Sequence, residues 1–167
     1  GPTLREIGEH PFLRRLCARI RARRGAAASR LLVPPGDDCA VVAPSGTPLA
    51  LTTDALVEDV HFRRGWLDWP QLGRRAIAVN LSDLAAMGAL PAWTLVAIAA
   101  PADFPAHALD EILDACADAS ESAGATLAGG NLTTAPVLSI TVTAGGDFPG
   151  ACLTRGGAKA GDVLHLR

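Results

Sequence analysis

Residues 76–87 carry the pattern that most constrains this fold, because they read as a helix that is apolar on nearly every side. Such a helix has to be buried between other layers, which a chain of 167 residues is long enough to supply. Its Asn80 and Asp83 are three residues apart and are expected to share one face. A buried carboxylate needs a cation or several donors. For Asp83 the sequence leaves two partners open: Arg74 or Arg75, and a metal ion.

The remaining chain mixes helical and strand patterns. Helices are expected over residues 4–24 (with an early break at Gly8 or Pro11), 70–87 and 105–123. Strands are expected over residues 39–43, 48–53, 93–100, 126–128, 137–145 and 163–166, with Ser45-Gly46 as a hairpin turn between the first two. This mixture predicts an α+β (mixed α/β) fold and argues against a repeating parallel barrel.

Composition excludes several classes of function. The formal net charge of −2 favours neither nucleic acid nor an acidic membrane surface as a partner. No apolar run reaches the roughly 20 residues that a membrane-spanning helix needs. The first apolar stretch is interrupted by charges, unlike a secretory signal, so we expect a cytoplasmic protein. The four cysteines form no C-x-x-C pair and are expected to be reduced.

Acidic residues stand in otherwise apolar surroundings at three places. They are Asp37-Asp38, Thr52-Thr53-Asp54 at the end of an expected strand, and Asp83. Singly, Asp37 has an ordinary interpretation as a turn residue and Asp54 as a cap. Together, at the ends of separate elements, these carboxylates favour a site for Mg²⁺, which prefers oxygen ligands.

A glycine pair, Gly129-Gly130, follows the expected strand at residues 126–128 and precedes Asn131. Glycines at such a position let the backbone approach a ligand and offer N–H groups to phosphate, although an ordinary tight turn explains them equally. The chain has neither G-x-x-x-x-G-K-[ST] nor G-x-G-x-x-G, which disfavours P-loop, protein-kinase and Rossmann sites.

The string Ala78-Val-Asn-Leu-Ser-Asp-Leu-Ala-Ala-Met-Gly-Ala89 resembles the signature of thiamine-monophosphate kinases. Further matches follow in the family's order over nearly the whole chain: Gly36-Asp-Asp-Cys-Ala40, Thr53-Asp-Ala-Leu-Val-Glu-Asp-Val-His-Phe62, Gly129-Gly-Asn131 and Thr154-Arg-Gly-Gly-Ala-Lys-Ala-Gly-Asp162. Related ATP-using synthetases of the aminoimidazole ribonucleotide, selenophosphate and hydrogenase-maturation types share the layout but lack the close match around Asp83 and His61.

The resemblance implies particular roles for residues of this chain. The metal ligands would be Asp37, Asp38, Thr52, Thr53, Asp54 and Asp83, with Asp54 and Asp83 also counted as catalytic. His61 would contact thiamine monophosphate, and Gly130, Asn131 and Arg155 would contact ATP. The chain departs from the family at Asn131, where an Asp is usual, so a metal-ligand role there is in doubt. Gly156 and Ala160 replace the usual Ser and Pro.

The resemblance also implies an organisation and an activity. Residues 3–167 would be the N-terminal Mg²⁺- and ATP-binding domain of a two-domain enzyme of the aminoimidazole ribonucleotide synthetase-like type, with the C-terminal domain absent. That domain would have a mixed sheet with flanking helices and dimerise through the sheet. The enzyme would transfer a phosphoryl group directly from ATP to thiamine monophosphate. Two alternatives are a non-catalytic dimerisation or nucleotide-binding module, and a paralogous ATP-dependent enzyme with another small phosphorylated substrate.

Overall fold

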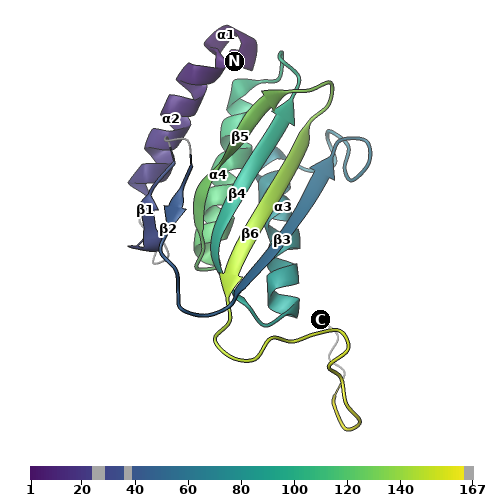
Figure 1. The fold of residues 1–167 in the computed structure, drawn as a ribbon. Coiled ribbons are helices and arrows are strands. Elements are labelled where there is room, and N and C mark those ends of the chain that lie inside the picture. Colours follow the sequence, from purple (N-terminus) through teal and green to yellow (C-terminus); the bar gives the residue numbers. More distant parts are fainter. Residues whose placement is uncertain (24–28, 36–38, 164–167) are drawn as a thin grey trace.

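The computed structural model describes residues 1–23, 29–35 and 39–163, which form two layers with an N-terminal arm (Figure 1). The elements in order are α1 (Leu4–Ile7), α2 (Glu9–Ala22), β1 (Leu31–Val33), β2 (Val41–Val42), β3 (Leu49–Val57), α3 (Trp69–Ala86), β4 (Leu90–Ala100), α4 (Ala106–Ser122), β5 (Thr126–Thr134) and β6 (Ser139–Asp147). Residues 149–163 extend away as an exposed tail. The expected mixed fold is confirmed.

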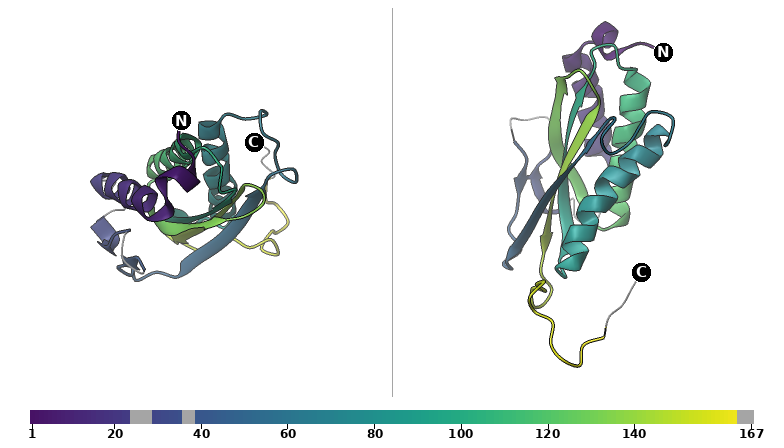
Figure 2. Two further views of the ribbon diagram at one scale, coloured as in Figure 1. Left: turned by 90° about the horizontal axis from the view of Figure 1, so that it is seen from above. Right: turned by 90° about the vertical axis from the view of Figure 1, so that its right-hand side faces the viewer.

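A four-stranded mixed sheet in the order β3-β6-β4-β5 is the centre of the fold. Strand β6 is antiparallel to both β3 and β4, whereas β4 and β5 are parallel. Two crossovers, β3-α3-β4 and β4-α4-β5, place both long helices on one face of the sheet (Figure 2). Helix α2 lies beside α4, with the small β1–β2 pair next to it (Figure 1). The sheet therefore has one helix-covered face and one face that the helices leave uncovered.

The core lies between the sheet and helices α3 and α4. Side chains from both layers are almost fully buried there: Leu56, Val96, Ile98, Ile140, Val142, Leu72, Ile77, Leu109 and Ile112. The two helices approach closely at Gly73, where a Cβ would lie 2.3 Å from the carbonyl oxygen of Ile112. Among the described residues, no helix is both long enough and apolar enough to span a membrane.

Local sequence signals explain the ends of the helices. Asp68 caps α3 with a capping box, because its carboxylate accepts from the Gln71 N–H while the Gln71 side chain accepts from the Asp68 N–H. The helix ends before Gly88, whose φ of +77° suits glycine. The expected early break near the N-terminus falls at Gly8, with φ of +82°, whereas Pro11 is accommodated in the first turn of α2.

Several expected strands differ in the structure. The hairpin predicted at Ser45-Gly46 is wrong, because β2 pairs with β1 and β3 pairs with β6. Strand β5 continues through the glycine pair to Thr134, so Gly129-Gly130 are not a turn after a strand. Strand β4 is buried only at alternate residues, although its sequence is continuously apolar. Of the strand expected at residues 163–166, only Val163 is described, and it is not in a strand.

Candidate functional site at the β3–α3 edge and the open face of the sheet

A hydrogen bond between β3 and α3 brings together two of the predicted metal-ligating residues. Thr52 Oγ1 donates to Asp83 Oδ2 over 2.7 Å. Thr52 faces the helices because even-numbered residues of β3 point to the side where Leu56 enters the core. Asp83 lies in the last turn of α3, over the edge of the sheet formed by β3. The pair places a hydroxyl and a carboxylate at one exposed edge of the molecule.

The expectation that Asp83 is buried is wrong. Its side chain is exposed, whereas Asn80 on the same helix is fully buried, so the two residues do not share an environment. Asn80 Nδ2 donates to the Ala76 carbonyl oxygen over 3.0 Å. Within the described residues neither Arg74 nor Arg75 forms an ion pair. Asp83 therefore needs no counter-ion to offset burial, and its partner in the protein is a hydroxyl.

Thr53 and Asp54 lie in the middle of β3, not at the end of a strand as expected. Because alternate residues point to opposite faces, Asp54 is on the helix side with Thr52, whereas Thr53 is on the open face. Thr53 Oγ1 donates to the Val142 carbonyl oxygen over 3.0 Å and accepts from Thr143 Oγ1 over 3.2 Å. Asp54 is exposed. The cap predicted as its ordinary role is absent because it lies inside a strand.

His61 follows the C-terminal end of β3, in the loop that joins β3 to α3, whereas Thr52 lies nearer the N-terminal end of the strand. Its imidazole accepts a hydrogen bond at Nδ1 from the Val57 N–H over 3.0 Å. The His61 side chain is exposed, and so is that of the neighbouring Trp66. The ring is thus available to a ligand from solvent.

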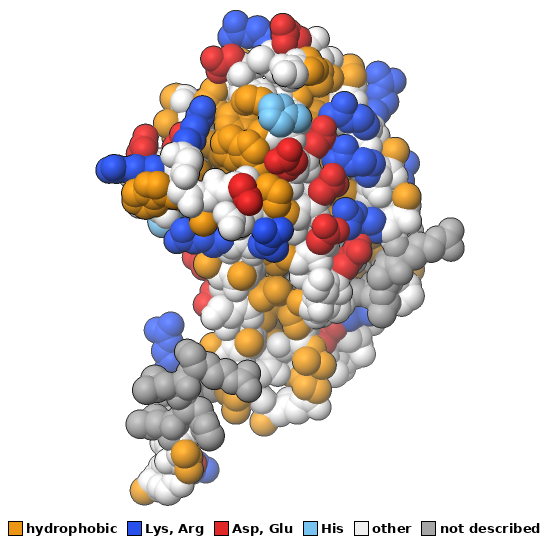
Figure 3. All heavy atoms as spheres, turned by 180° about the vertical axis from the view of Figure 1, so that it is seen from behind, with side chains coloured by type: hydrophobic (Ala, Val, Ile, Leu, Met, Phe, Trp, Pro, Cys, Tyr) orange, Lys and Arg blue, Asp and Glu red, His pale blue; other side chains and the backbone are white. Residues whose placement is uncertain are grey.

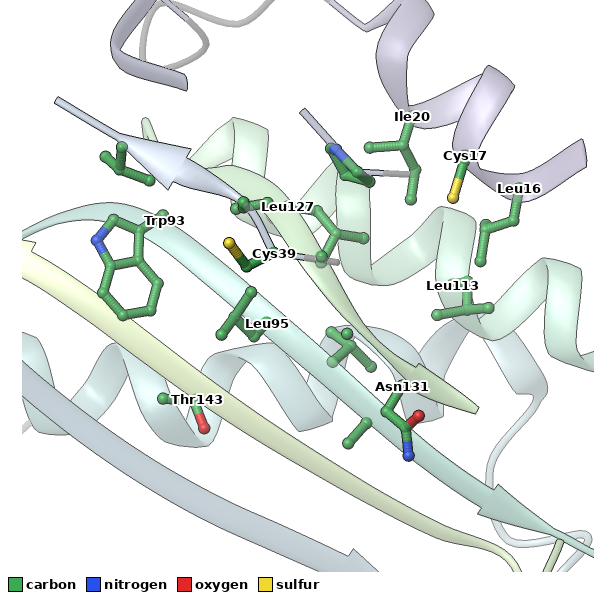
Figure 4. Close-up of a pocket in the computed structure, with 18 of the residues that line it drawn as sticks. Leu16, Cys17, Ile20, Cys39, Trp93, Leu95, Leu113, Leu127, Asn131 and Thr143 are labelled. Carbon is green, nitrogen blue, oxygen red and sulfur yellow. The ribbon is translucent and has the colours of Figure 1, made fainter. Parts of the chain in front are cut away.

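Gly130 and Asn131 lie on β5, at the other edge of the sheet. A Cβ on Gly130 would lie 1.8 Å from the Val96 carbonyl oxygen, so packing against β4 alone accounts for glycine there. Asn131 points to the open face and lines a cavity of about 1530 Å³ between α2, the β1–β2 region and the sheet (Figure 4). The cavity is largely apolar, with Leu16 of α2, Trp93 and Leu95 of β4, and Leu127 of β5 among its walls.

The predicted site residues do not all lie together within one chain. Asn131 and Asp54 lie on opposite edge strands, three strand spacings or about 14 Å apart, and on opposite faces. Arg155 lies in the exposed tail, which touches the end of α3 where the Leu153 N–H donates to the Met87 carbonyl oxygen over 3.0 Å. Asp37 and Asp38 lie outside the described residues.

The side chains at the β3–α3 edge offer the type of ligand that Mg²⁺ prefers, because they carry hydroxyl and carboxylate oxygens that face water. Among the described residues, however, no three His, Cys, Asp or Glu side chains are arranged to hold a metal ion. Completing such a site needs further oxygen ligands, from residues 37–38, from a nucleotide or from another chain.

Three polar arrangements were missed by the sequence analysis. Arg15, Arg19 and Arg23 of α2 form ion pairs with Asp110, Asp114, Asp118 and Glu121 of α4, a cluster of mixed charge visible on the back of the molecule (Figure 3). The arginines repeat every four residues and the acidic residues every three or four, and this spacing was the signal that could have identified the pairing. The arginine-bearing side of α2 is thus an interhelical contact. Arg30 with Asp147, and Arg64 with Glu58, join segments whose pairing no local pattern reveals.

Comparison with known proteins identifies the family to which this chain belongs. Residues 36–147 match the family described as AIR synthase related protein, N-terminal domain, and the chain belongs to that family. Its relatives include proteins named thiamine-monophosphate kinase. The enzyme of that name from Mycobacterium tuberculosis (strain CDC 1551 / Oshkosh) is 40% identical over 167 residues, covering 99% of this chain and 49% of its own length. That from Escherichia coli (strain K12) is 40% identical over 163 residues, covering 95% and 47%.

Solved structures agree. AaThiL complexed with AMPPCP and TMP superposes with a TM-score of 0.65 at 30% identity, over 95% of this chain and 48% of that one. The chain thus spans about half the length of the curated relatives and solved structures that it matches. The expected fold type and family resemblance are confirmed.

Proposed function

We propose that residues 3–167 are the N-terminal, Mg²⁺- and ATP-binding domain of a cytoplasmic two-domain kinase that phosphorylates thiamine monophosphate to thiamine diphosphate. The observation that carries the proposal is the Thr52–Asp83 hydrogen bond, which joins two of the metal ligands implied by the family resemblance at one exposed edge. Support comes from relatives named thiamine-monophosphate kinase and from one solved with AMPPCP, an ATP analogue, and TMP.

The chemistry of this transfer fits a surface of oxygen donors. Phosphoryl transfer requires positioning and charge neutralisation more than a covalent intermediate, because two anions have to approach each other. Bound Mg²⁺ would supply that neutralisation, held by Thr52, Asp54 and Asp83 on the helix side together with residues 37–38, whereas Thr53 faces the other side of β3. A phosphate monoester acceptor is already ionised near neutral pH, so no side chain has to act as a strong base. His61 would then contact the substrate and Arg155 the nucleotide.

A homodimer through the sheet is part of the proposal, and exposed apolar side chains on the open face of β3 support it. Two copies packed through their open faces would place β5 of one copy near β3 of the other and cover Leu49 and Leu51, which are 50% and 63% exposed. Analytical ultracentrifugation of the chain tests this arrangement. A dimer that Leu51→Glu dissociates is expected, and a wild-type monomer at high micromolar concentration excludes it.

Isothermal titration with Mg-ATP tests the nucleotide site directly. The wild-type chain is expected to bind only when Mg²⁺ is present, and Asp83→Asn to weaken binding about tenfold or more, because a carboxylate ligand is lost. Asp103→Asn is the matched control, since Asp103 is also exposed but lies in the loop before α4. Equal binding by both variants rules Asp83 out of the site.

The transfer itself is tested in a chain of the full length of the relatives, by following thiamine diphosphate formation from ATP and thiamine monophosphate. We expect turnover by that protein and little by residues 1–167 alone. Binding of Mg-ATP without turnover by the longer protein would favour a nucleotide-binding module. Turnover only with another small phosphorylated acceptor would favour a paralogous enzyme.

A further inference from the structure

The loop between β3 and α3 is held more tightly than its exposure suggests. Phe62 is only 3% exposed and belongs to the hydrophobic core. The Asp59 N–H donates to the Phe62 carbonyl oxygen over 2.7 Å, and the His61 N–H donates to the Val57 carbonyl oxygen over 2.8 Å. Asp59 adopts the left-handed conformation, with φ of +65°, which closes this turn. His61 therefore stands on a fixed backbone.

The His61 imidazole is also held through one of its nitrogens. The Val57 N–H donates to Nδ1 over 3.0 Å, so Nδ1 presents its lone pair and cannot carry the proton of the neutral ring. The proton is then on Nε2, which makes Nε2 a hydrogen-bond donor. Because the side chain is exposed, this donor is available to an anionic oxygen in solvent.

Glu58 connects this loop to its surroundings. Its carboxylate accepts from the Leu138 N–H over 3.1 Å and forms an ion pair with Arg64, whose guanidinium lies 5.2 Å from the centre of the Phe104 ring. Burial opposes ionisation of Glu58, but hydrogen bonds from Arg64 and the Leu138 N–H outweigh it and lower the pKa of the carboxyl. The carboxylate is thus charged and joins the start and the middle of the loop to Leu138, the residue before β6.

We infer that Glu58 and Arg64 are positioning residues that hold His61 in its Nε2–H form, as a hydrogen-bond donor to a phosphate oxygen of the acceptor substrate. The role of His61 as a donor to the substrate rests on the proposed function, whereas the effect of Glu58 and Arg64 on the tautomer of its ring does not. Glu58 and Arg64 act on His61 through the backbone of the loop, which their ion pair and the bond to the Leu138 N–H hold in place. Arg63, the neighbouring cation, stacks instead on Trp66 at 5.5 Å and provides a matched control.

The holding of the ring is tested in the 167-residue chain by long-range ¹H–¹⁵N correlation of the histidine rings at about pH 8, where imidazole is neutral. His61→Gln assigns the signals. The wild-type protein and Arg63→Ala are expected to show only the Nε2–H form at His61, and Glu58→Ala and Arg64→Ala a mixture with Nδ1–H. Glu58→Gln, which keeps the shape but loses the charge, covers the case in which Glu58→Ala does not fold. A single Nε2–H form in folded Arg64→Ala and Glu58→Gln overturns the inference.

The role toward substrate is tested by steady-state kinetics of the full-length protein. Glu58→Gln and Arg64→Ala are expected to raise the KM for thiamine monophosphate about tenfold, because the loss of one hydrogen bond of about 1.4 kcal/mol weakens binding by that factor. The kcat and the KM for ATP are expected to change less than about twofold. Adding either change to His61→Gln is expected to have little further effect. An unchanged KM in an active enzyme overturns the substrate role. A wild-type protein inactive on thiamine monophosphate instead refutes the proposed function, and the ring spectra still decide whether Glu58 and Arg64 hold His61.

Discussion

Replacing Gly130 by alanine would place a methyl group against the backbone of the neighbouring strand. The added Cβ would lie 1.8 Å from the Val96 carbonyl oxygen and 2.7 Å from its carbonyl carbon, whereas real Cβ contacts stay beyond 3.0 Å. The obstacle is the backbone of β4, inside the sheet, and cannot rotate away as a side chain could. Strands β4 and β5 would therefore have to separate locally around the Val96–Gly130 pair.

The cost follows from that separation. Forcing an extra methyl into a close-packed site costs about 1–3 kcal/mol, and each weakened ladder hydrogen bond adds about 1 kcal/mol. We expect Gly130→Ala to lower the free energy of unfolding by about 3 kcal/mol. In a domain of this size that corresponds to a fall in Tm of roughly 6–12 °C. Gly129→Ala is the matched control, because its Cβ would meet only the Leu95 side chain at 3.4 Å.

Urea unfolding followed by far-UV circular dichroism measures both variants. Gly130→Ala is expected to shift the midpoint strongly with an unchanged m-value, and Gly129→Ala to remain within about 1 kcal/mol of the wild-type protein. Equal stability of the two variants would refute the steric argument. Gly130 would then be required by its ligand and not by the β4–β5 contact.

Three further outcomes are expected. Burial raises the pKa of the Cys116 thiol to about 12, so a thiol reagent at pH 8 should label exposed Cys152 rapidly and Cys116 only on unfolding, as peptide mapping would show. Burial of Asp147 opposes its ionisation, but hydrogen bonds from Ser45 and Arg30 outweigh burial and lower the pKa of its carboxyl. The ionised carboxylate therefore stabilises the fold at pH values above its ordinary pKa of 3.8, and this contribution is lost as the pH falls through the lower pKa of the folded state. Asp147→Asn should flatten this part of the acid-unfolding curve. Asp110→Ala should lower stability by about 1 kcal/mol at low salt and by less at about 1 M NaCl, measured by thermal unfolding, because its ion pairs with α2 are partly exposed.

Much of the fold followed from periodicity, while strand pairing did not. Helix α3 was predicted to within about one residue because an apolar pattern ends at Gly88, where only a glycine closes the helix easily. The partner of β3 is β6, more than 80 residues away, and nothing in the local turn at Ser45-Gly46 reveals that choice. Residues 129–131 were interpreted as lying outside a strand, because glycine usually interrupts strands. The close contact of Gly130 with β4 instead makes glycine necessary inside strand β5.

The sequence by itself determined the mixed fold, the family-like motifs and the residue types of the candidate site, because these depend on spacing along the chain. Only the tertiary structure decided which of those residues meet. It joined Thr52 to Asp83 through the packing of α3 on β3 and exposed a carboxylate that the pattern placed in the core. It also set Asn131 and Asp54 on opposite edges of one sheet, because strand order is fixed by long-range pairing that leaves no periodic trace in the sequence.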